Sequence, residues 1–251
     1  MKSDGLILLL KFPEQGKVKT RLAKTLGNEL TYGLYECFIQ DLLEKCDNQH
    51  YDLHLFLTPV EKMAEMALQI GQKHGLHAQQ GADLGERMKN AFITMFKLNY
   101  ERCIILGSDY PNIPAQLPQK AFKYLHTAKG VIAPSTDGGY YLLGFQREEF
   151  CSDVFSHVDW STEKVFQQTM SIFNTAGIFP KILPEGQDID EFADLEHLIN
   201  GCLNKNDSFY ASHTMDFIRK HKNELEEKKK EGPTNYSNLH ELTQKKMTNP
   251  F

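Results

Sequence analysis

The sequence has 251 residues, of which 41% are hydrophobic and 24% charged, a composition ordinary for a globular protein. Its formal net charge of −5 argues against a general nucleic-acid binder, because contact with a phosphate backbone requires a basic surface. No apolar run approaches the ~18 residues of a membrane span and no Cys-x-x-Cys pair occurs, so we expect a cytoplasmic protein with reduced thiols.

The first predicted element is a buried strand over residues 5–12, where a continuous apolar run leads into a basic loop. Ammonium and guanidinium groups pair with phosphate oxygens, and glycine lets the backbone approach closely, so this loop is suited to a polyanion. A solvated basic loop is the alternative, and the loop taken alone favours it. The spacing matches neither the Walker pattern nor Gly-x-Gly-x-x-Gly. The candidate residues are Lys11, Pro13, Gly16, Lys17, Lys19 and Arg21.

Helices and strands then alternate along the chain. We expect a helix over 29–43, a strand over 51–57, a helix over 60–74, a short strand over 77–80 and a helix ending near Leu98. Asp83 and Glu86 have the spacing of a capping box, which by itself explains both residues structurally. A role for Asp83 and Arg87 beside a nucleoside therefore needs support from another feature.

The most informative element is the strand predicted over 103–106, which stops abruptly at Gly107-Ser108-Asp109. Pro111 prevents the strand from continuing. Ligands of open α/β sheets bind beyond the carboxyl ends of the strands, so Asp109 faces the expected site. The alternative is that Asp109 only caps the next helix, predicted over 116–127.

A second informative stretch follows the strand predicted over 130–133. Gly138 and Gly139, directly after Asp137, permit positive φ angles and a concave set of amides that would hold an anion or a sugar hydroxyl. A further strand is predicted over 140–145. Asp-Gly is also a strong hairpin signal, and a hairpin alone would explain Asp137.

Trp160 is the only tryptophan, and it precedes a helix predicted to be capped by Ser161 or Thr162 and to run through Ala176. Its indole would stack on a sugar or serve as a hydrophobic staple of that helix. Taken alone, the position favours the staple.

Asp188 and Asp190 follow the last predicted strand, over 178–183, and precede a helix that runs through Leu203. They lie where a second hard oxygen ligand for a metal would be needed. The alternative is N-capping of the helix, which one aspartate would satisfy.

From residue 204 the pattern weakens to a charged helix over 216–230 and a polar tail. We therefore expect one domain over 1–203 and a charged C-terminal extension over 204–251 without chemistry of its own. The alternation of strands and helices predicts an α/β protein, a three-layer sandwich with a mostly parallel sheet.

Six motifs in order over about residues 5 to 200 resemble a bacterial family of nucleotide-diphospho-sugar transferase-like proteins with the GT-A fold, a group linked by name to arsenosugar biosynthesis. They are Lys11-x-Pro-x-x-Gly-x-Val-Lys-Thr-Arg-Leu, Gly-Ala-Asp-Leu-Gly-Glu-Arg-Met, Leu-Gly-Ser-Asp-x-Pro, Pro-x-x-Asp-Gly-Gly-Tyr-Tyr-Leu-Leu-Gly, Asp-Trp-Ser-Thr and Asp-Ile-Asp-x-x-x-Asp-Leu. The last fifty or so residues lie outside the resemblance.

The resemblance implies a role for particular residues. Lys11, Lys19 and Arg21, with Pro13 and Gly16 in the same loop, would hold the diphosphate of a nucleotide. These positions match the N-terminal nucleotide loop of the family.

The acidic motifs imply the rest of the site. Asp83 and Arg87 would lie by the nucleoside, and Asp109 would bind Mg²⁺ or Mn²⁺ on the diphosphate in place of the glycosyltransferase Asp-x-Asp. This chain has a single carboxylate there, so its metal affinity should depend on another ligand. Asp190 matches the late Asp-x-x-x-Asp-Leu motif, which resembles the motif of the second metal ligand in related cytidylyltransferases. Asp137 would face the sugar or acceptor as the catalytic candidate. The remaining substrate-binding candidates are Gly138, Gly139, Tyr140 and Trp160.

These implications favour a metal-dependent glycosyltransferase that moves a sugar from a nucleotide-diphosphate donor to a small hydroxyl acceptor. A nucleotidyltransferase that releases pyrophosphate is the first alternative, because fold alone does not separate the two reactions. A non-catalytic nucleotide-sugar sensor is the second. We expect a divalent metal as cofactor and small molecules, not nucleic acid, as partners.

Overall fold

The computed structural model describes residues 3–71, 73–204 and 211–231. Its strands form one seven-stranded sheet in the order β3-β2-β1-β4-β6-β5-β7, in which β6 runs antiparallel to both of its neighbours and the other pairs are parallel. The strands are β1 (Asp4–Lys11), β2 (Asp52–Thr58), β3 (Gly75–Ala78), β4 (Arg102–Gly107), β5 (Gly130–Pro134), β6 (Tyr140–Gln146) and β7 (Lys181–Ile182).

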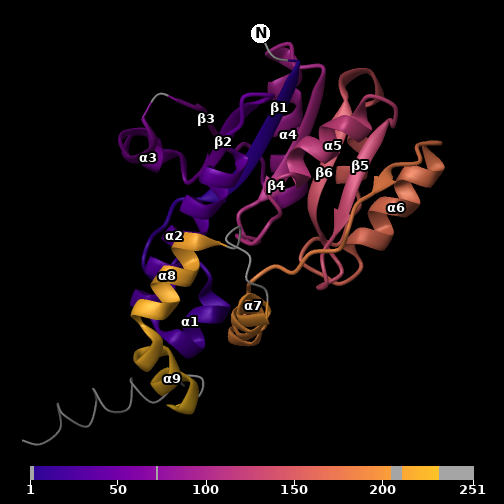
Figure 1. The fold of residues 1–251 in the computed structure, drawn as a ribbon. Coiled ribbons are helices and arrows are strands. Elements are labelled where there is room, and N and C mark those ends of the chain that lie inside the picture. Colours follow the sequence, from indigo (N-terminus) through magenta and orange to yellow (C-terminus); the bar gives the residue numbers. More distant parts are fainter. Residues whose placement is uncertain (1–2, 72, 205–210, 232–251) are drawn as a thin grey trace, which may run out of the picture.

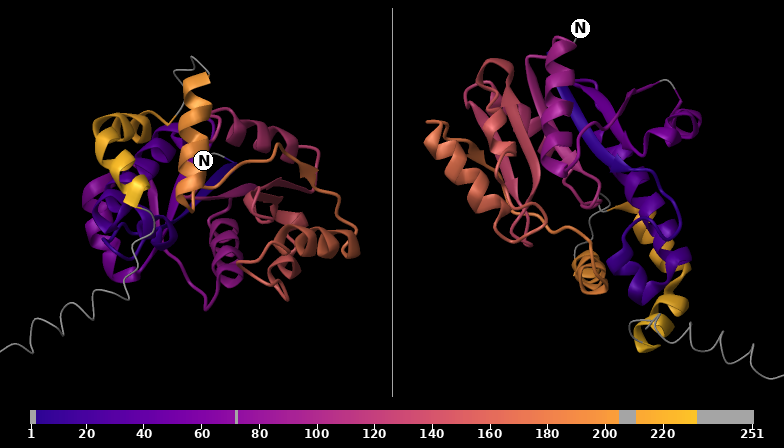
Figure 2. Two further views of the ribbon diagram at one scale, coloured as in Figure 1. Left: turned by 90° about the horizontal axis from the view of Figure 1, so that it is seen from below. Right: turned by 180° about the vertical axis from the view of Figure 1, so that it is seen from behind.

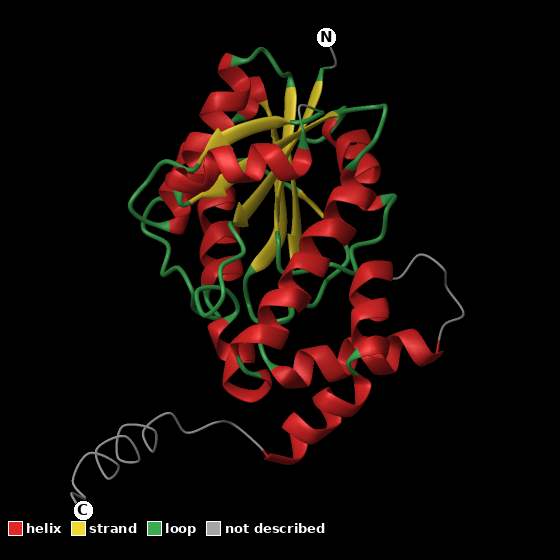
Figure 3. Ribbon diagram, turned by 90° about the vertical axis from the view of Figure 1, so that its left-hand side faces the viewer, coloured by secondary structure: helices red, strands yellow, loops and turns green. Residues whose placement is uncertain are grey.

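Helices cover both faces of this sheet (Figures 1 and 3). They are α1 (Thr20–Leu26), α2 (Asn28–Cys46), α3 (Met63–Ile70), α4 (Leu84–Lys97), α5 (Leu117–Leu125), α6 (Val165–Thr175), α7 (Phe192–Asn204), α8 (Ser212–Lys220) and α9 (Lys222–Glu231). Side chains of α2 and α5 pack on one face, and those of α4 and α6 pack on the other. The predicted three-layer α/β sandwich is thus confirmed.

The central strands are apolar throughout because each is buried on both faces. In β1, Leu6, Leu8 and Leu10 belong to the core beneath α2, whereas Ile7 and Leu9 belong to the core beneath α4. A parallel strand covered on two sides reads as a continuous apolar run, since successive side chains point to opposite faces. β1 pairs with β4 from Asp4 to Leu9, so both strands finish at the same edge of the sheet.

Several local predictions differ from the structure. The strand predicted over 178–183 is the two-residue β7, and the charged helix predicted over 216–230 is two helices, α8 and α9. Helix α1 was not predicted, because its apolar positions follow the basic loop without a capping signal, and its N-cap, Lys19, makes no side-chain cap hydrogen bond. Neither Ser161 nor Thr162 caps α6, because the helix begins only at Val165, with Lys164 as its N-cap, after a turn in which Ser161 adopts a left-handed φ of 65°. The helix predicted over 60–74 is a 3₁₀ turn, Val60–Lys62, followed by α3.

The described part of the C-terminal extension packs on the α/β domain. Asp41 in α2 accepts hydrogen bonds from the backbone N–H groups of His213 and Thr214, each at 2.9 Å, and so caps α8. The ring of Phe217 lies so close to Gly33 that a Cβ at Gly33 would stand 2.7 Å from it. Helices α1, α7, α8 and α9 gather beyond the end of the sheet where β1 finishes (Figures 1 and 2). The division at residue 203 stays a prediction.

Across the described residues, no helix combines the length and apolar character needed to cross a membrane.

Candidate active site

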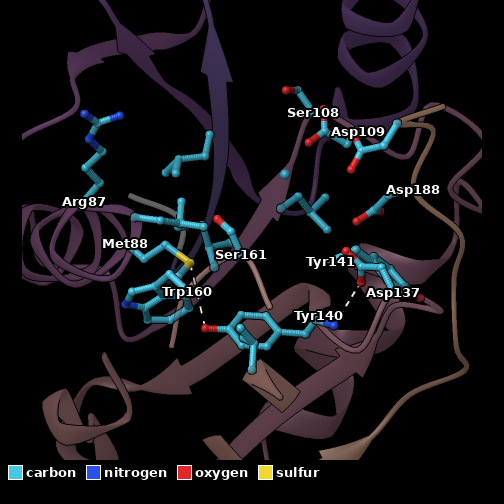
Figure 4. A pocket seen from close by; sticks show the side chains of 18 of the residues that line it. Arg87, Met88, Ser108, Asp109, Asp137, Tyr140, Tyr141, Trp160, Ser161 and Asp188 are labelled. Carbon is cyan, nitrogen blue, oxygen red and sulfur yellow. Dashed lines mark hydrogen bonds between the residues drawn. The ribbon is translucent and has the colours of Figure 1, made fainter. Parts of the chain in front are cut away.

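A pocket of about 600 Å³ lies at the carboxyl edge of β1, β2 and β4. Its wall includes Lys11 and Thr58 at the ends of two strands and the Gly107-Ser108-Asp109 turn after a third. This is the edge where open α/β sheets bind ligands. The two ends of the pocket differ in chemistry, since Asp109, Asp137 and Asp188 lie on one side and Arg87, Met88 and Trp160 on the other (Figure 4).

The acidic side contains four aspartates that line the pocket, namely Asp109, Asp137, Asp188 and Asp190. Two of them converge on one cation. The Lys19 ammonium Nζ lies 2.5 Å from Asp109 Oδ1 and 2.9 Å from Asp190 Oδ1. The structure thus brings together the two residues predicted as metal ligands, but it places between them a lysine that was predicted to hold a diphosphate.

Backbone contacts fix the two carboxylates. The N–H of Ile189 donates to the carbonyl of Asp109 at 2.8 Å, and the Ile189 side chain is buried in the core. This single anchor joins the loop after β4 to the segment before α7. Asp194 Oδ2 accepts from the backbone N–H groups of Asp190, at 3.1 Å, and Glu191, at 2.8 Å. The Asp-Ile-Asp-x-x-x-Asp-Leu motif therefore encodes an anchored turn that presents alternate carboxylates to the pocket.

The loop that carries Asp109 is also held from the side of α2. The hydroxyl of Tyr35 lies 2.9 Å from Ser108 Oγ and donates to the carbonyl of Lys11 at 3.1 Å. Burial raises the pKa of Tyr35 to about 12, so the phenol keeps its proton for these contacts. The ends of β1 and β4 are thereby tied to one helix.

The sequence indicates Asp188 only as a neighbour of Asp190, yet the structure buries its carboxyl in the acidic side of the pocket. Burial, followed by the nearby Asp109 carboxylate, raises its pKa from 3.8 to about 7. The sequence signal for Asp188 is the alternation in Asp-Ile-Asp. Because the Ile189 side chain points into the core, the side chains of Asp188 and Asp190 point the other way, toward the pocket. How deeply each neighbour is buried depends on the surrounding loops.

Asp137 lies in the predicted hairpin between β5 and β6, and the antiparallel pairing of these strands confirms that hairpin. Its Oδ1 accepts from the N–H of Gly139 at 2.9 Å (Figure 4). Gly139 and Tyr140 line the pocket, whereas Gly138 is not among the lining residues. Gly138 has a φ of 87° and a Cβ there would collide with the backbone of Glu163, so glycine is required to seat the segment before α6.

Trp160 lines the pocket and packs on the first turn of α4. A Cβ at Gly85 would stand 2.5 Å from the indole Nε1, and the ring meets Tyr140 edge to face at 6.4 Å between centroids. The indole therefore joins two elements and still borders the cavity. Beside the indole, the hydroxyl of Tyr140 lies 4.0 Å from the sulfur of Met88 (Figure 4).

Asp83 caps α4 as predicted, whereas Glu86 reaches back one residue beyond the N-cap of a standard capping box. Asp83 Oδ1 accepts from the N–H of Glu86, and Glu86 Oε2 accepts from the N–H of Ala82, both at 2.8 Å. Asp83 is absent from the described lining of the pocket, whereas Arg87 lines it and donates to the carbonyl of Gly81 at 3.2 Å. A nucleoside contact thus fits Arg87 better than Asp83.

The N-terminal loop contributes cations unequally. Lys11 and Arg21 line the pocket, while Pro13, Gly16 and Lys19 do not figure in its described lining. Arg21 donates to Glu191 at 2.5 Å and lies 3.7 Å from Asp190. Lys11 donates to the carbonyl of Lys17 at 2.5 Å, which draws the loop back toward its own strand.

The acidic side of the pocket fits a divalent cation. Carboxylate oxygens are the ligands that Mg²⁺ and Mn²⁺ prefer, and the ammonium of Lys19 shows that Asp109 and Asp190 can share one positive charge. Elsewhere in the described chain, Asp41, Glu44 and His213 bring potential ligand atoms within 4.8 Å of one another. In that group Asp41 already serves as the cap of α8.

The sheet order and the acidic pocket at its carboxyl edge define an α/β protein of the nucleotide-diphospho-sugar transferase fold, the GT-A type. A crystal structure of a "putative nucleotide-diphospho-sugar transferase" from Desulfovibrio desulfuricans G20 matches with a TM-score of 0.85 and 37% sequence identity, over 91% of this chain and 99% of that chain. The chain therefore belongs to the family of that protein, the nucleotide-diphospho-sugar transferase-like proteins.

Other comparisons concern a part of the chain or its fold. A family model described as "Uncharacterized protein conserved in bacteria (DUF2064)" matches residues 42–162. The structure of 4-diphosphocytidyl-2C-methyl-D-erythritol synthase from Anaerococcus prevotii DSM 20548 matches with a TM-score of 0.52 at 10% identity, over 81% of this chain and 99% of that chain, which shows a shared fold. A search of curated protein sequences gives no match.

Proposed function

We propose that the protein is a metal-dependent glycosyltransferase that moves a sugar from a nucleotide-diphosphate donor to a small hydroxyl acceptor. The observation that carries the proposal is the pair Asp109 and Asp190. These two carboxylates line a pocket of about 600 Å³ and share the Lys19 ammonium. Membership of a family that includes a protein named for nucleotide-diphospho-sugar transfer supports the donor class.

Each side of the pocket has a proposed task. Asp109 and Asp190 would hold Mg²⁺ or Mn²⁺, which when bound supplies positive charge to the departing diphosphate. Lys11 and Arg21 face the pocket and would pair with the phosphate oxygens. Trp160 lines the pocket and would offer its indole ring to a sugar or a base as a stacking partner.

Asp137 is the proposed acceptor-side residue. Its carboxylate lines the pocket and is oriented by the N–H of Gly139, so it is positioned to orient an acceptor hydroxyl or to take its proton. Asp188 lies on the same side of the pocket (Figure 4). Its carboxyl, whose pKa is raised by burial, lines the pocket as well.

The reaction is tested by incubating the protein with UDP-, GDP-, ADP-, CDP- and TDP-sugars, Mn²⁺ and a panel of small hydroxyl acceptors. Release of a nucleoside diphosphate, together with a glycosylated acceptor, is the expected result. Metal-dependent thermal stabilisation by one donor, about 2.7 kcal/mol at 100 times its dissociation constant, would identify the base beforehand. Turnover that is unchanged by a chelator would contradict the metal-dependent proposal.

The nucleotidyltransferase alternative rests on the same charges, because Lys11, Arg21 and a metal would bind a triphosphate equally well. The Anaerococcus synthase shares the fold of this chain, although that likeness concerns architecture only. Pyrophosphate as the product from a nucleoside triphosphate would replace the first proposal with this one. Tight nucleotide-sugar binding without turnover on any acceptor would favour the non-catalytic sensor.

A further inference from the structure

Lys19 has a buried side chain, two carboxylate partners and a left-handed backbone conformation. Its side chain is only 5% exposed, whereas the two carboxylates that it contacts, Asp109 and Asp190, are 45% and 38% exposed. The buried ammonium therefore lies beneath two carboxylates that remain open to the pocket. A ligand approaching from solvent meets the carboxylates first.

Lys19 is paired with both carboxylates. Its ammonium Nζ contacts Asp109 Oδ1 and Asp190 Oδ1, so two negative charges adjoin one buried positive charge. A buried ammonium held by two carboxylates is satisfied, and it would be left without a counter-charge only if both carboxylates were removed. The ion triad is thus a stable arrangement in the protein without ligand.

The backbone of Lys19 is also unusual. Its φ of 45° and ψ of 47° are left-handed, a conformation that lysine rarely adopts. The carbonyl of Lys19 accepts the N–H of Ala23 at 2.9 Å, so the residue opens α1 while its side chain turns toward the aspartates. The surrounding contacts hold this conformation, as is typical of residues at functional sites.

We infer that Lys19 is a built-in counter-ion, which occupies the divalent-cation position between Asp109 and Asp190 until a ligand arrives. This inference rests on the metal site of the proposed function. The ammonium must withdraw from at least one carboxylate before that carboxylate can bind another cation. A phosphate group in the pocket would give the released ammonium a new partner, so binding of metal and of diphosphate should favour each other.

The first consequence concerns metal binding without nucleotide. Mn²⁺ binding is measured by electron paramagnetic resonance for the wild-type protein, for Lys19→Met, and for Lys17→Met as the control. Lys17 belongs to the same loop and pairs with Glu14, away from the aspartates. We expect Lys19→Met to bind Mn²⁺ at least about tenfold more tightly than the wild type, because two unpaired carboxylates then face one site. Lys17→Met should bind as the wild type does.

The reverse result is equally informative. If Lys19→Met binds Mn²⁺ no better than the wild type while Asp109→Asn weakens binding in both backgrounds, the counter-ion role is wrong and the metal site of the proposed function stands. If neither protein binds Mn²⁺ and Asp109→Asn has no effect, the metal site is wrong, and the counter-ion role with it.

A second measurement uses the wild-type chain and does not depend on a variant that folds. The ¹⁵Nζ resonance of a buried, doubly paired ammonium is protected from exchange with water, so Lys19 should give an observable lysine signal. Addition of Mg²⁺ should remove or shift that signal as the ammonium leaves the carboxylates. A signal that stays unchanged at Mg²⁺ saturation would overturn the inference.

Discussion

Two polar clusters of this protein look alike in composition and differ in what surrounds them. The first is the ion triad of Lys19, Asp109 and Asp190 at the carboxyl edge of the sheet. The second, which we call the histidine cluster, consists of Asp52, His54, His77 and Tyr100 on and beside β2 and the edge strand β3. Both are networks of titratable groups held by short contacts.

We call the histidine cluster closed because its members hydrogen-bond to one another in series. Tyr100 donates its hydroxyl proton to Asp52 at 3.0 Å, so its oxygen accepts from His54 Nε2 at 2.8 Å. His54 Nδ1 must then accept from His77 Nε2, at 2.9 Å. Each hydrogen bond of this series therefore has one donor and one acceptor.

The ion triad is arranged in the opposite way. Its cation is buried and its carboxylates are open to a pocket, so oxygen lone pairs remain for a ligand. None of the residues of the histidine cluster is part of the described lining of that pocket. The comparison teaches that perturbed ionisable groups indicate function only where a cavity meets them, since closed networks perturb pKa values as well.

The largest expected effect comes from the open cluster. Asp109→Asn should lower transferase turnover on the order of 10²-fold or more, because it removes charge that is needed at the leaving diphosphate. Its melting temperature should change little, since Asp190 still neutralises Lys19. Turnover and thermal melting are measured beside Asp216→Asn, a substitution at an aspartate whose side chain is 75% exposed. Normal turnover by Asp109→Asn would contradict the proposed site.

The closed cluster should show the reverse pattern. Tyr100→Phe removes the oxygen that accepts from His54, and an unpaired buried donor costs about 1–3 kcal/mol. Urea unfolding should report that loss while turnover stays near the wild-type value. Tyr32→Phe is the matched control, since its hydroxyl bonds only to Glu36 one turn along α2, and its cost should be about 0.5 kcal/mol or less. A large loss of turnover in Tyr100→Phe would contradict the prediction that the histidine cluster affects stability alone.

The closed cluster also predicts how stability depends on pH. Burial, followed by the neighbouring His77, lowers the pKa of His54 from 6.5 to about 4. The unfolded chain therefore binds a proton that the folded chain refuses, so the free energy of unfolding is highest above pH 6.5 and falls as the pH approaches 4.

Allowing for the partial exposure of the ring, we expect this loss to be about 1–2 kcal/mol. Urea unfolding at several pH values measures it, and His54→Gln, which cannot titrate, should flatten this part of the profile. Equal acid sensitivity in His54→Gln and the wild type would assign the loss to other groups.

The smallest expected effect lies at the support of the open cluster. Ser108→Ala removes the hydroxyl that contacts Tyr35, but Tyr35 keeps its bond to the carbonyl of Lys11. Stability should fall by about 0.5–1.5 kcal/mol, and turnover by less than about tenfold, because the carboxylate of Asp109 itself is untouched. A loss as large as that of Asp109→Asn would show that Ser108 contacts the substrate.

Much of the fold could be predicted from local signals. The continuous apolar run of β1, the stop after β4 and the hairpin at Asp137 depend on a few neighbouring residues, and all three occur as expected. The N-cap of α4 at Asp83 is equally local. Such features follow from backbone stereochemistry and from the burial of both sheet faces, which the order of residues alone specifies.

The sequence by itself thus determined the α/β architecture and the strand end that carries Asp109. Only the tertiary structure decided which charges meet, because Lys19 and Asp190 are separated by 171 positions in the chain and come together through the packing of α1 beside α7. The same holds for the burial that raises the pKa of Asp188 and for the packing of Trp160 on Gly85. Charge pairing and desolvation depend on distances between distant segments, and no local pattern records those distances.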